Sequence, residues 1–143
     1  MGWLEFTTLV LSVLGLADSA YQTYTHYSGI GLLGCNANGD ACVLVQHSPE
    51  SIVFGIPVAV LGVAFYLFMV PICSPWAWRS ALPVIRRVRL ASVAIGMCFV
   101  LYLIYAELIE IGRICPYCTS VHIITFLLFS LIVFQTAMRS PRT

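Results

Sequence analysis

The sequence contains no lysine, and charge of either sign is scarce along its whole length. Charged residues make up 9% of the 143 residues, whereas a typical soluble domain has about 25%. All seven basic residues are arginines, and the formal net charge is +1. The composition therefore excludes an ordinary soluble domain, and the charge gives no indication of a nucleic-acid partner.

Hydrophobic residues are correspondingly abundant: they make up 60% of the chain, and the mean hydropathy is +0.95. A helix needs about 20 apolar residues to cross a hydrocarbon core about 30 Å thick. Four runs reach that length without the alternation typical of β-barrel strands: residues 3–24, 52–73, 90–111 and 115–138. The sequence thus predicts an all-α integral membrane protein. We expect one domain, residues 1–143, built as a four-transmembrane-helix bundle with a cysteine-bearing loop, residues 25–51, between the first two helices.

The arginines are distributed unevenly between the two sides of this expected bundle. All except Arg113 lie between the second and third runs or in the C-terminal tail, at positions Arg79, Arg86, Arg87, Arg89, Arg139 and Arg142. Cytoplasmic loops of membrane proteins carry the excess of Arg and Lys. We therefore expect both termini on the cytoplasmic side and the 25–51 loop on the extracytoplasmic side, where disulfides persist.

Four of the six cysteines fall on this expected extracytoplasmic side, in two pairs: Cys35 and Cys42, Cys115 and Cys118. The other two, Cys73 and Cys98, lie in apolar runs. A free cysteine in a core behaves as a small hydrophobic residue, so we expect these two to serve in packing.

The second pair forms a C-P-Y-C motif where the last apolar run begins. Backbone N–H groups at a helix N-terminus stabilise a thiolate, and thiols in C-x-x-C motifs commonly have a lowered pKa. The spacing alone also fits a static disulfide or half of a zinc site. A second pair on the same side favours redox chemistry, because two dithiols can pass electrons between them by exchange.

Several stretches of the chain together resemble the vitamin K epoxide reductase family, in its bacterial and archaeal form without a fused thioredoxin domain. They are AYQTYTHYSG, then C-x6-C, then SPESIVFGIPVAVLGVAFY, then YAELIEIGRICPYCTSVH, and they cover most of the length. DsbB-like proteins share the four-helix bundle and the two cysteine pairs. In those proteins, however, the helix-end C-x-x-C comes first and the loop pair second, the reverse of the order here.

The resemblance implies a role for each outer cysteine. Cys118 matches the sulfur that reacts with the quinone, and Cys115 matches its partner facing the loop. Cys42 matches the relay cysteine that exchanges with Cys115, and Cys35 matches the cysteine that meets the protein electron donor. Ser48 fits the supporting loop serine of the family, with Ser51 as an alternative.

Two positions near the quinone depart from the animal enzymes of this family. His122 stands where those enzymes have a quinone-binding tyrosine, and an imidazole can still donate to a quinone carbonyl. Val58 stands where they have an asparagine. The second difference weakens the expectation of epoxide reduction and leaves simple quinone reduction in place.

The resemblance implies a quinone-linked thiol-disulfide oxidoreductase that supports disulfide formation. Electrons would enter from a thioredoxin-fold, DsbA-like partner, and the acceptor would be a lipid quinone of the menaquinone, ubiquinone or vitamin K type. No metal is implied. The expected location is a prokaryotic cytoplasmic membrane, with multiple spans and the redox cysteines extracytoplasmic.

Two other classes of function fit the same cysteines. The four outer sulfurs could form a tetrathiolate zinc site, or two disulfides could staple a scaffold that has no catalytic activity. The carboxylates Asp18, Glu107 and Glu110 lie near the expected outer helix ends. We expect them to be wetted or hydrogen-bonded structural groups, with Arg113 as a partner.

Overall fold

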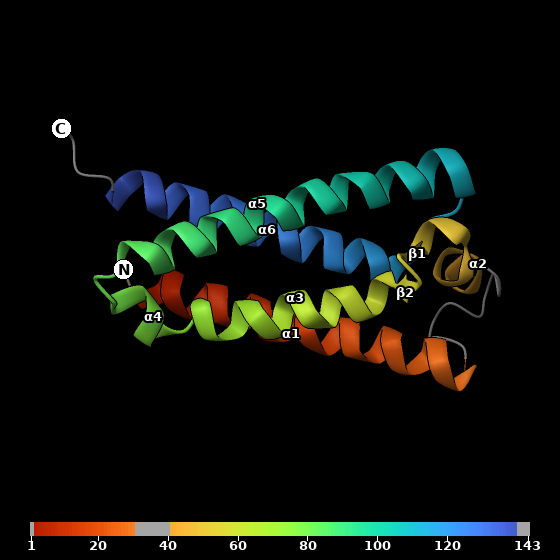
Figure 1. Ribbon diagram of the computed structural model, residues 1–143, viewed down its shortest axis with the longest axis horizontal. Coiled ribbons are helices and arrows are strands. Elements are labelled where there is room, and N and C mark those ends of the chain that lie inside the picture. Colours follow the sequence, from red (N-terminus) through yellow and green to blue (C-terminus); the bar gives the residue numbers. More distant parts are fainter. Residues whose placement is uncertain (1, 31–40, 140–143) are drawn as a thin grey trace.

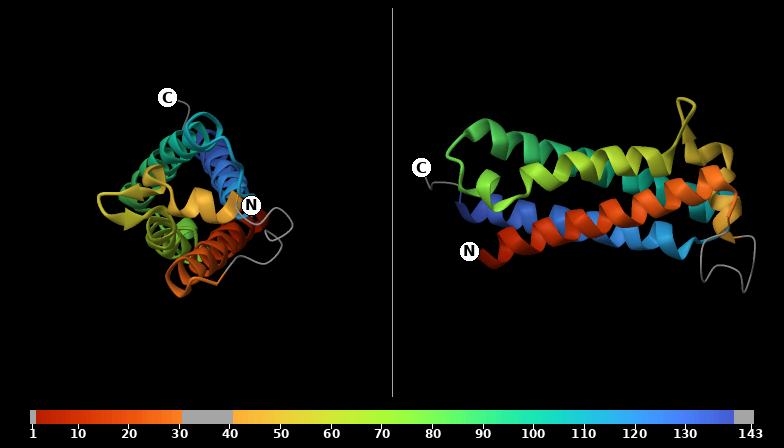
Figure 2. Two further views of the ribbon diagram at one scale, coloured as in Figure 1. Left: turned by 90° about the vertical axis from the view of Figure 1, so that its right-hand side faces the viewer. Right: turned by 90° about the horizontal axis from the view of Figure 1, so that it is seen from below.

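Four long helices lie side by side in a computed structural model of the chain, which describes residues 2–30 and 41–139 (Figure 1). They are α1 (Gly2–Ser28), α3 (Val58–Ile72), α5 (Pro83–Tyr105) and α6 (Pro116–Arg139). Helix α1 packs against α3 and α6, and α5 packs against α6 and α3, so that the four helices close a ring seen end-on in Figure 2. Both described ends of the chain lie at one end of the bundle.

The short elements cap the two ends of this bundle. Helix α4 (Pro75–Arg79) lies at the end that carries both termini. At the opposite end lie α2 (Ala41–His47), a 3₁₀ turn (Pro49–Ser51) and the hairpin of β1 (Ile52–Val53) and β2 (Ile56–Pro57). Helix α5 continues there into a π-helix (Ala106–Ile111), which ends at Gly112 in the left-handed conformation. The segment expected as a loop between the first two spans thus contains a helix, α2.

Three of the helices are long and apolar enough to cross a membrane, by length and composition: Gly2–Ser28, Pro83–Ile111 and Pro116–Arg139. Helix α3 is as apolar but has 15 residues. At 1.5 Å per residue it extends about 22 Å, less than a hydrocarbon core of about 30 Å. The chain is therefore a mostly helical membrane protein.

The helices begin and end at residues that differ from the apolar runs. The second run was expected to be helical from residue 52, but α3 begins at Val58. Phe54 and Gly55, at the tip of the hairpin, both have positive φ, 53° and 78°, which reverse the chain, and Pro57 lacks the N–H that an earlier helical turn would use. Helix α5 begins at Pro83, before its apolar run, because proline suits the first turn of a helix.

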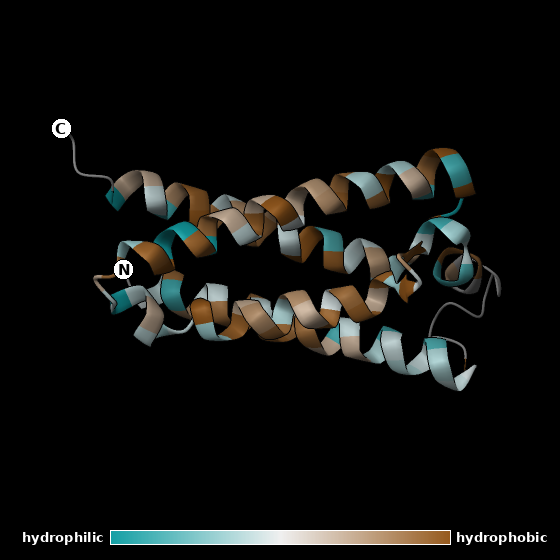
Figure 3. Cartoon of the chain, in the orientation of Figure 1, coloured by the Kyte–Doolittle hydropathy of each residue, from teal (hydrophilic) through white to brown (hydrophobic). Residues whose placement is uncertain are grey.

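Many polar side chains face the interior of the bundle and many large apolar side chains face outward, the reverse of the arrangement in a soluble protein. Buried polar residues of α1 face the other helices: Thr8, Ser12, Ser19, Gln22 and Thr25. Large hydrophobic side chains lie on the outer surface instead, and Figure 3 shows such residues along the length of the helices. The small inward residues let the helices approach closely, as in other membrane bundles.

Tyr66 marks the centre of the buried core, with Met69, Val93, Leu128 and Ile132 around it. Its ring lies against the backbone of α1 at Gly15, where a Cβ atom would collide with the ring. Its hydroxyl is hydrogen-bonded to the Thr125 hydroxyl, 2.7 Å away. This contact joins α1, α3 and α6 just below the cysteine end of the bundle.

Candidate active site

Cys115 and Cys118 lie where α6 begins. Pro116 is the first residue of the helix, and the Cys115 carbonyl accepts the Thr119 N–H over 2.9 Å. The pKa of the Cys115 thiol is lowered from 9.0 to about 7 by hydrogen bonds from the Cys118 thiol and from the backbone N–H groups of Cys118 and Tyr117, against the opposing effect of burial. Cys115 is therefore an activated thiol at a helix N-terminus.

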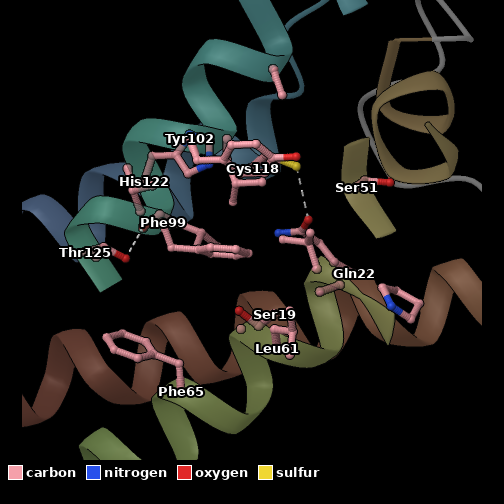
Figure 4. A pocket seen from close by; sticks show the side chains of 18 of the residues that line it. Ser19, Gln22, Ser51, Leu61, Phe65, Phe99, Tyr102, Cys118, His122 and Thr125 are labelled. Carbon is pink, nitrogen blue, oxygen red and sulfur yellow. Dashed lines mark hydrogen bonds between the residues drawn. The ribbon is translucent and has the colours of Figure 1, made fainter. Parts of the chain in front are cut away.

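The two sulfurs of the motif face different neighbours. Cys115 is fully buried and packs in a cluster with Cys42 and Val45 of α2. Cys118 lines a cavity between the helices, and its thiol donates a hydrogen bond to Gln22 Oε1 over 3.3 Å (Figure 4). One sulfur of the pair is thus directed to the loop segment and the other to the interior of the bundle.

The cavity beside Cys118 has a volume of about 540 Å³. Its walls come from all four long helices and from the α2 segment, and most of the lining side chains are apolar, including Leu61, Phe65 and Phe99 (Figure 4). A largely apolar cavity with a few polar groups suits an organic ligand with a flat, apolar ring system. Val58, the position that departs from the animal enzymes, also lines it.

His122 lies one helical turn beyond Cys118 on the same face of α6, and both residues line the cavity. The imidazole is buried, and none of the described residues forms a hydrogen bond with it. Thr125, one further turn along, is held by Tyr66. Cys118, His122 and Thr125 therefore form a polar line down one wall of the cavity (Figure 4).

A second polar group on this cavity comes from α2. The side-chain nitrogen of Gln46 is buried and has no hydrogen-bond partner within residues 2–30 and 41–139. Gln46 lines the cavity. A buried donor without a partner is unfavourable by about 1–3 kcal/mol, so this amide is suited to a ligand acceptor. Spacing in the sequence does not indicate Gln46, because its position depends on how α2 folds over the bundle.

Glu107 is a buried carboxylate beside both sulfurs. Its side chain lies within hydrogen-bonding reach of the Cys115 backbone amide and of the Cys118 thiol. In the described part of the chain, ion pairs join Glu5 with Arg79 and Arg139, and Arg113 meets Glu107 through its backbone N–H instead. Glu107 was expected to be a structural group. Its hydrogen bond with the Cys115 amide agrees with that expectation, and its place in a π-helix, a frequent feature of functional sites, adds a functional role that spacing in the sequence does not indicate.

Five of the six cysteines lie within the described residues, and their bonding states differ. Cys42 is disulfide-bonded, whereas Cys73, Cys98, Cys115 and Cys118 are free thiols. Cys35 lies outside the described residues. Cys73 is buried near the end that carries the termini, and Cys98 is exposed on α5.

Ser48 and Ser51 have different surroundings. The Ser48 hydroxyl donates to the Val45 carbonyl over 2.9 Å and stays at the end of α2. The Ser51 hydroxyl donates to the carbonyls of Gln46 (2.7 Å) and Ser48 (2.8 Å), and Ser51 lines the cavity. Ser51 thus joins the loop segment to the cavity wall.

Metal binding by these cysteines would require several potential ligands to lie together. Among residues 2–30 and 41–139, no three His, Cys, Asp or Glu side chains are grouped so as to hold a metal ion. A disulfide sulfur is not a thiolate ligand, so the tetrathiolate zinc site would require Cys42 in its reduced form.

The fold and site define a class of protein: a membrane-embedded helical bundle with a dithiol between a cysteine-bearing segment and an apolar cavity. A protein-family model described as Vitamin K epoxide reductase family matches residues 6–133. No curated protein matches the chain. The chain belongs to the vitamin K epoxide reductase family, and it is therefore, in general terms, a quinone-linked thiol oxidoreductase of the membrane.

Proposed function

We propose that the chain oxidises the dithiol of a thioredoxin-fold, DsbA-like partner and reduces a lipid quinone. The observation that carries the proposal is the division of contacts at the C-P-Y-C motif. Cys115 packs with the disulfide-bonded Cys42, and Cys118 lines an apolar cavity. The reductant is a protein in water and the oxidant is dissolved in the membrane, so one cysteine of the pair has to be reached from the loop segment and the other from the cavity.

The proposed reaction balances in three stages. The partner dithiol reduces the Cys35–Cys42 disulfide and leaves as a disulfide. The Cys42 thiolate then attacks Cys115 in the Cys115–Cys118 disulfide and releases Cys118, and Cys35 attacks Cys42 to free Cys115. The resulting Cys115–Cys118 dithiol gives two electrons and two protons to the quinone and closes again as a disulfide. Free Cys115 and Cys118 beside a disulfide-bonded Cys42 match the state before this last step.

Cys118, His122 and Gln46 contact the quinone head group in this proposal, and Cys115 acts on Cys118. The Cys118 sulfur adds to the quinone ring, and Cys115, whose pKa is lowered to about 7, attacks Cys118 to release the quinol. His122 and the buried amide of Gln46, which has no hydrogen-bond partner among the described residues, donate to the two carbonyl oxygens. Val58 offers no hydrogen bond, which favours simple quinone reduction over epoxide reduction. The supporting serine is Ser51 rather than Ser48, since Ser51 lines the cavity.

Glu107 supplies the proton route. Its carboxylate lies beside the Cys118 thiol and can take the thiol proton as the sulfur attacks, then return a proton to the quinol oxygen. The uneven distribution of arginines supports an orientation with both termini cytoplasmic and the cysteine end extracytoplasmic. The resemblance to bacterial and archaeal members of the family supports a prokaryotic cytoplasmic membrane.

The relay is tested by trapping its mixed disulfide. In a Cys35→Ser variant, Cys42 has no competing partner and should accumulate as a disulfide with Cys115, leaving Cys118 as a thiolate beside the quinone. We expect a charge-transfer absorption that disappears in Cys35→Ser/Cys118→Ser, and a Cys42–Cys115 link in non-reducing digests. A digest with Cys115 bonded to Cys118 and Cys42 free would show that the loop segment does not reach the active site.

The complete reaction is tested by anaerobic mixing of the protein with a reduced thioredoxin-fold protein and a soluble quinone. Quinol should form in proportion to the partner disulfide produced. Zinc that co-purifies in amounts equal to the protein would instead favour the tetrathiolate site, and disulfides that resist mild reductant would favour the stapled scaffold.

A further inference from the structure

A second cavity lies at the opposite end of the bundle from the cysteines. It has a volume of about 440 Å³ and is enclosed by α4, the first turns of α5 and the last turns of α6. These elements lie together at the end that carries both termini (Figure 1). Its lining includes three arginines, Arg86, Arg89 and Arg139, and no carboxylate among the described residues.

Arg89 is the buried centre of this arginine cavity. It is 3% exposed, its Nε donates to the Ile72 carbonyl over 2.7 Å, and its guanidinium lies 3.7 Å from the ring centroid of Trp78. These contacts fix the plane of the guanidinium. Its Nη2 has no hydrogen-bond partner in the described part of the chain. A buried cation with an unused donor is unfavourable unless an anion meets it.

The nearest carboxylate is already shared by other arginines. Glu5 lies 3.5 Å from Arg139 and 3.8 Å from Arg79, and Arg139 also donates to the Trp78 carbonyl. Among the described residues, no carboxylate pairs with Arg86 or Arg89, so these two arginines bring positive charge to the cavity.

Exposed apolar side chains lie beside Arg86 at the rim of the cavity. Leu82 lines it and is 60% exposed, and the neighbouring Trp76 and Val84 are also exposed. Tryptophan beside exposed aliphatic residues at the end of a membrane helix is typical of the lipid–water interface. A ligand with a phosphate group and apolar chains would place its phosphate in the cavity and its chains along these apolar residues.

We propose that the arginine cavity binds the phosphate group of an anionic membrane lipid. Guanidinium groups bind phosphate oxygens through pairs of parallel hydrogen bonds, and basic pockets at the ends of membrane helices bind lipid head groups. The unused Nη2 of Arg89 supplies the buried donor and Arg86 the outer one. This site is remote from the quinone cavity and does not depend on the redox proposal.

The test compares two neighbouring arginines of α5. Arg86 lines the cavity, whereas Arg87 does not, and both are exposed. The wild type, Arg86→Gln and Arg87→Gln are delipidated in a neutral detergent, and their thermal unfolding is followed during titration with phosphatidylglycerol, phosphatidylcholine or inorganic phosphate. We expect phosphatidylglycerol to raise Tm in the wild type and in Arg87→Gln, and the apparent affinity to fall about fivefold in Arg86→Gln.

Arg89→Gln should abolish the rise in Tm that phosphatidylglycerol causes. If Arg89→Gln does not fold, the comparison of Arg86→Gln with Arg87→Gln still tests the proposal. If inorganic phosphate, but not phosphatidylglycerol, raises Tm in the wild type and in Arg87→Gln and fails to do so in Arg86→Gln, the site binds a free anion and the lipid proposal is wrong. Equal responses of Arg86→Gln and Arg87→Gln to phosphatidylglycerol would overturn the proposal, as would equal stabilisation by phosphatidylcholine in all three proteins.

Discussion

Cys118 and Gln22, which are 96 residues apart in the chain, are joined by a hydrogen bond of 3.3 Å from the thiol to Oε1. Gln22 in turn donates through Nε2 to the Asp18 carboxylate over 3.0 Å. The chain of bonds runs along α1 and ends at the sulfur that faces the cavity. It fixes the direction of the Cys118 side chain from outside its own helix.

Replacing Gln22 with leucine should slow quinone reduction, because Cys118 then loses the group that orients its thiol toward the cavity. A side-chain hydrogen bond of this kind contributes about 1 kcal/mol, so we expect a decrease of about fivefold. Stopped-flow mixing of the reduced protein with a soluble quinone measures this step. Exchange between the partner and the loop disulfide serves as the control and should keep its rate. A wild-type rate of quinone reduction in Gln22→Leu would show that α1 does not orient the sulfur.

His122→Phe should weaken quinone reduction while leaving exchange with the partner protein intact. The phenyl ring keeps the volume of the side chain and removes its hydrogen bond to the quinone, which should raise the KM for quinone about tenfold. Ser120→Ala, on the exposed face of the same helix, is the matched control. Equal loss of both half-reactions in His122→Phe would assign the histidine a structural role.

The quinone-reduction step should depend on pH through Cys115. Its pKa is lowered from 9.0 to about 7, so the reactive thiolate predominates above pH 7 and is lost as the pH falls below it. Single-turnover rates measured from pH 5.5 to 8.5 should rise with pH and then level off, and they should fall about fivefold from pH 7 to pH 6. A rate that still rises steeply at pH 8.5 would mean that the hydrogen bonds with Cys118 and Tyr117 do not lower the pKa of this thiol.

Gly15→Ala should destabilise the bundle because its new methyl group meets the buried ring of Tyr66. Overpacking of this kind is unfavourable by about 1–3 kcal/mol, and we expect Tm to fall by about 5 °C. The displaced ring should also release Thr125 and reduce the stabilisation that quinone gives. Gly2→Ala, with no atom within 4 Å of the added Cβ, is the control for helix propensity. The same Tm in both variants would contradict this packing.

The presence of the long helices could be predicted because apolar runs of about 20 residues form helices in lipid. The start of α3 could not be placed by counting apolar residues. Phe54 and Gly55 turn the chain within an apolar stretch, and the turn is decided by local backbone conformation and by Pro57. Helix α2 lies in a segment too short and mixed for a periodic signal.

The relative placement of Cys115, Cys118 and His122 could be predicted because they lie within two turns of one helix, where spacing in the sequence fixes spacing in the structure. Gln22, Gln46 and Glu107 reach the same sulfurs or cavity from other segments. Which face of α1 turns inward is decided by packing of its small residues against α3 and α6. The direction of Glu107 is set by the π-helix, which shifts the face that its side chain presents.

Glu107→Gln tests whether this carboxylate moves a proton. Glutamine keeps the shape and an oxygen acceptor for the Cys115 amide, so the active-site backbone should stay in place, but it cannot take the Cys118 proton. General acid–base catalysis contributes about a hundredfold or more, and we expect a loss of that size in quinone reduction at neutral pH. The rate of exchange between the partner and the loop disulfide should be unchanged.

Glu110→Gln provides the matched control for this prediction, because Glu110 lies on the same π-helix and is exposed. A solvent deuterium isotope effect on quinone reduction should be present in Glu110→Gln and altered in Glu107→Gln, since only the second variant changes the proton route. If both variants reduce quinone at the wild-type rate, the protons pass through His122 or solvent, and Glu107 serves only to hold the Cys115 amide.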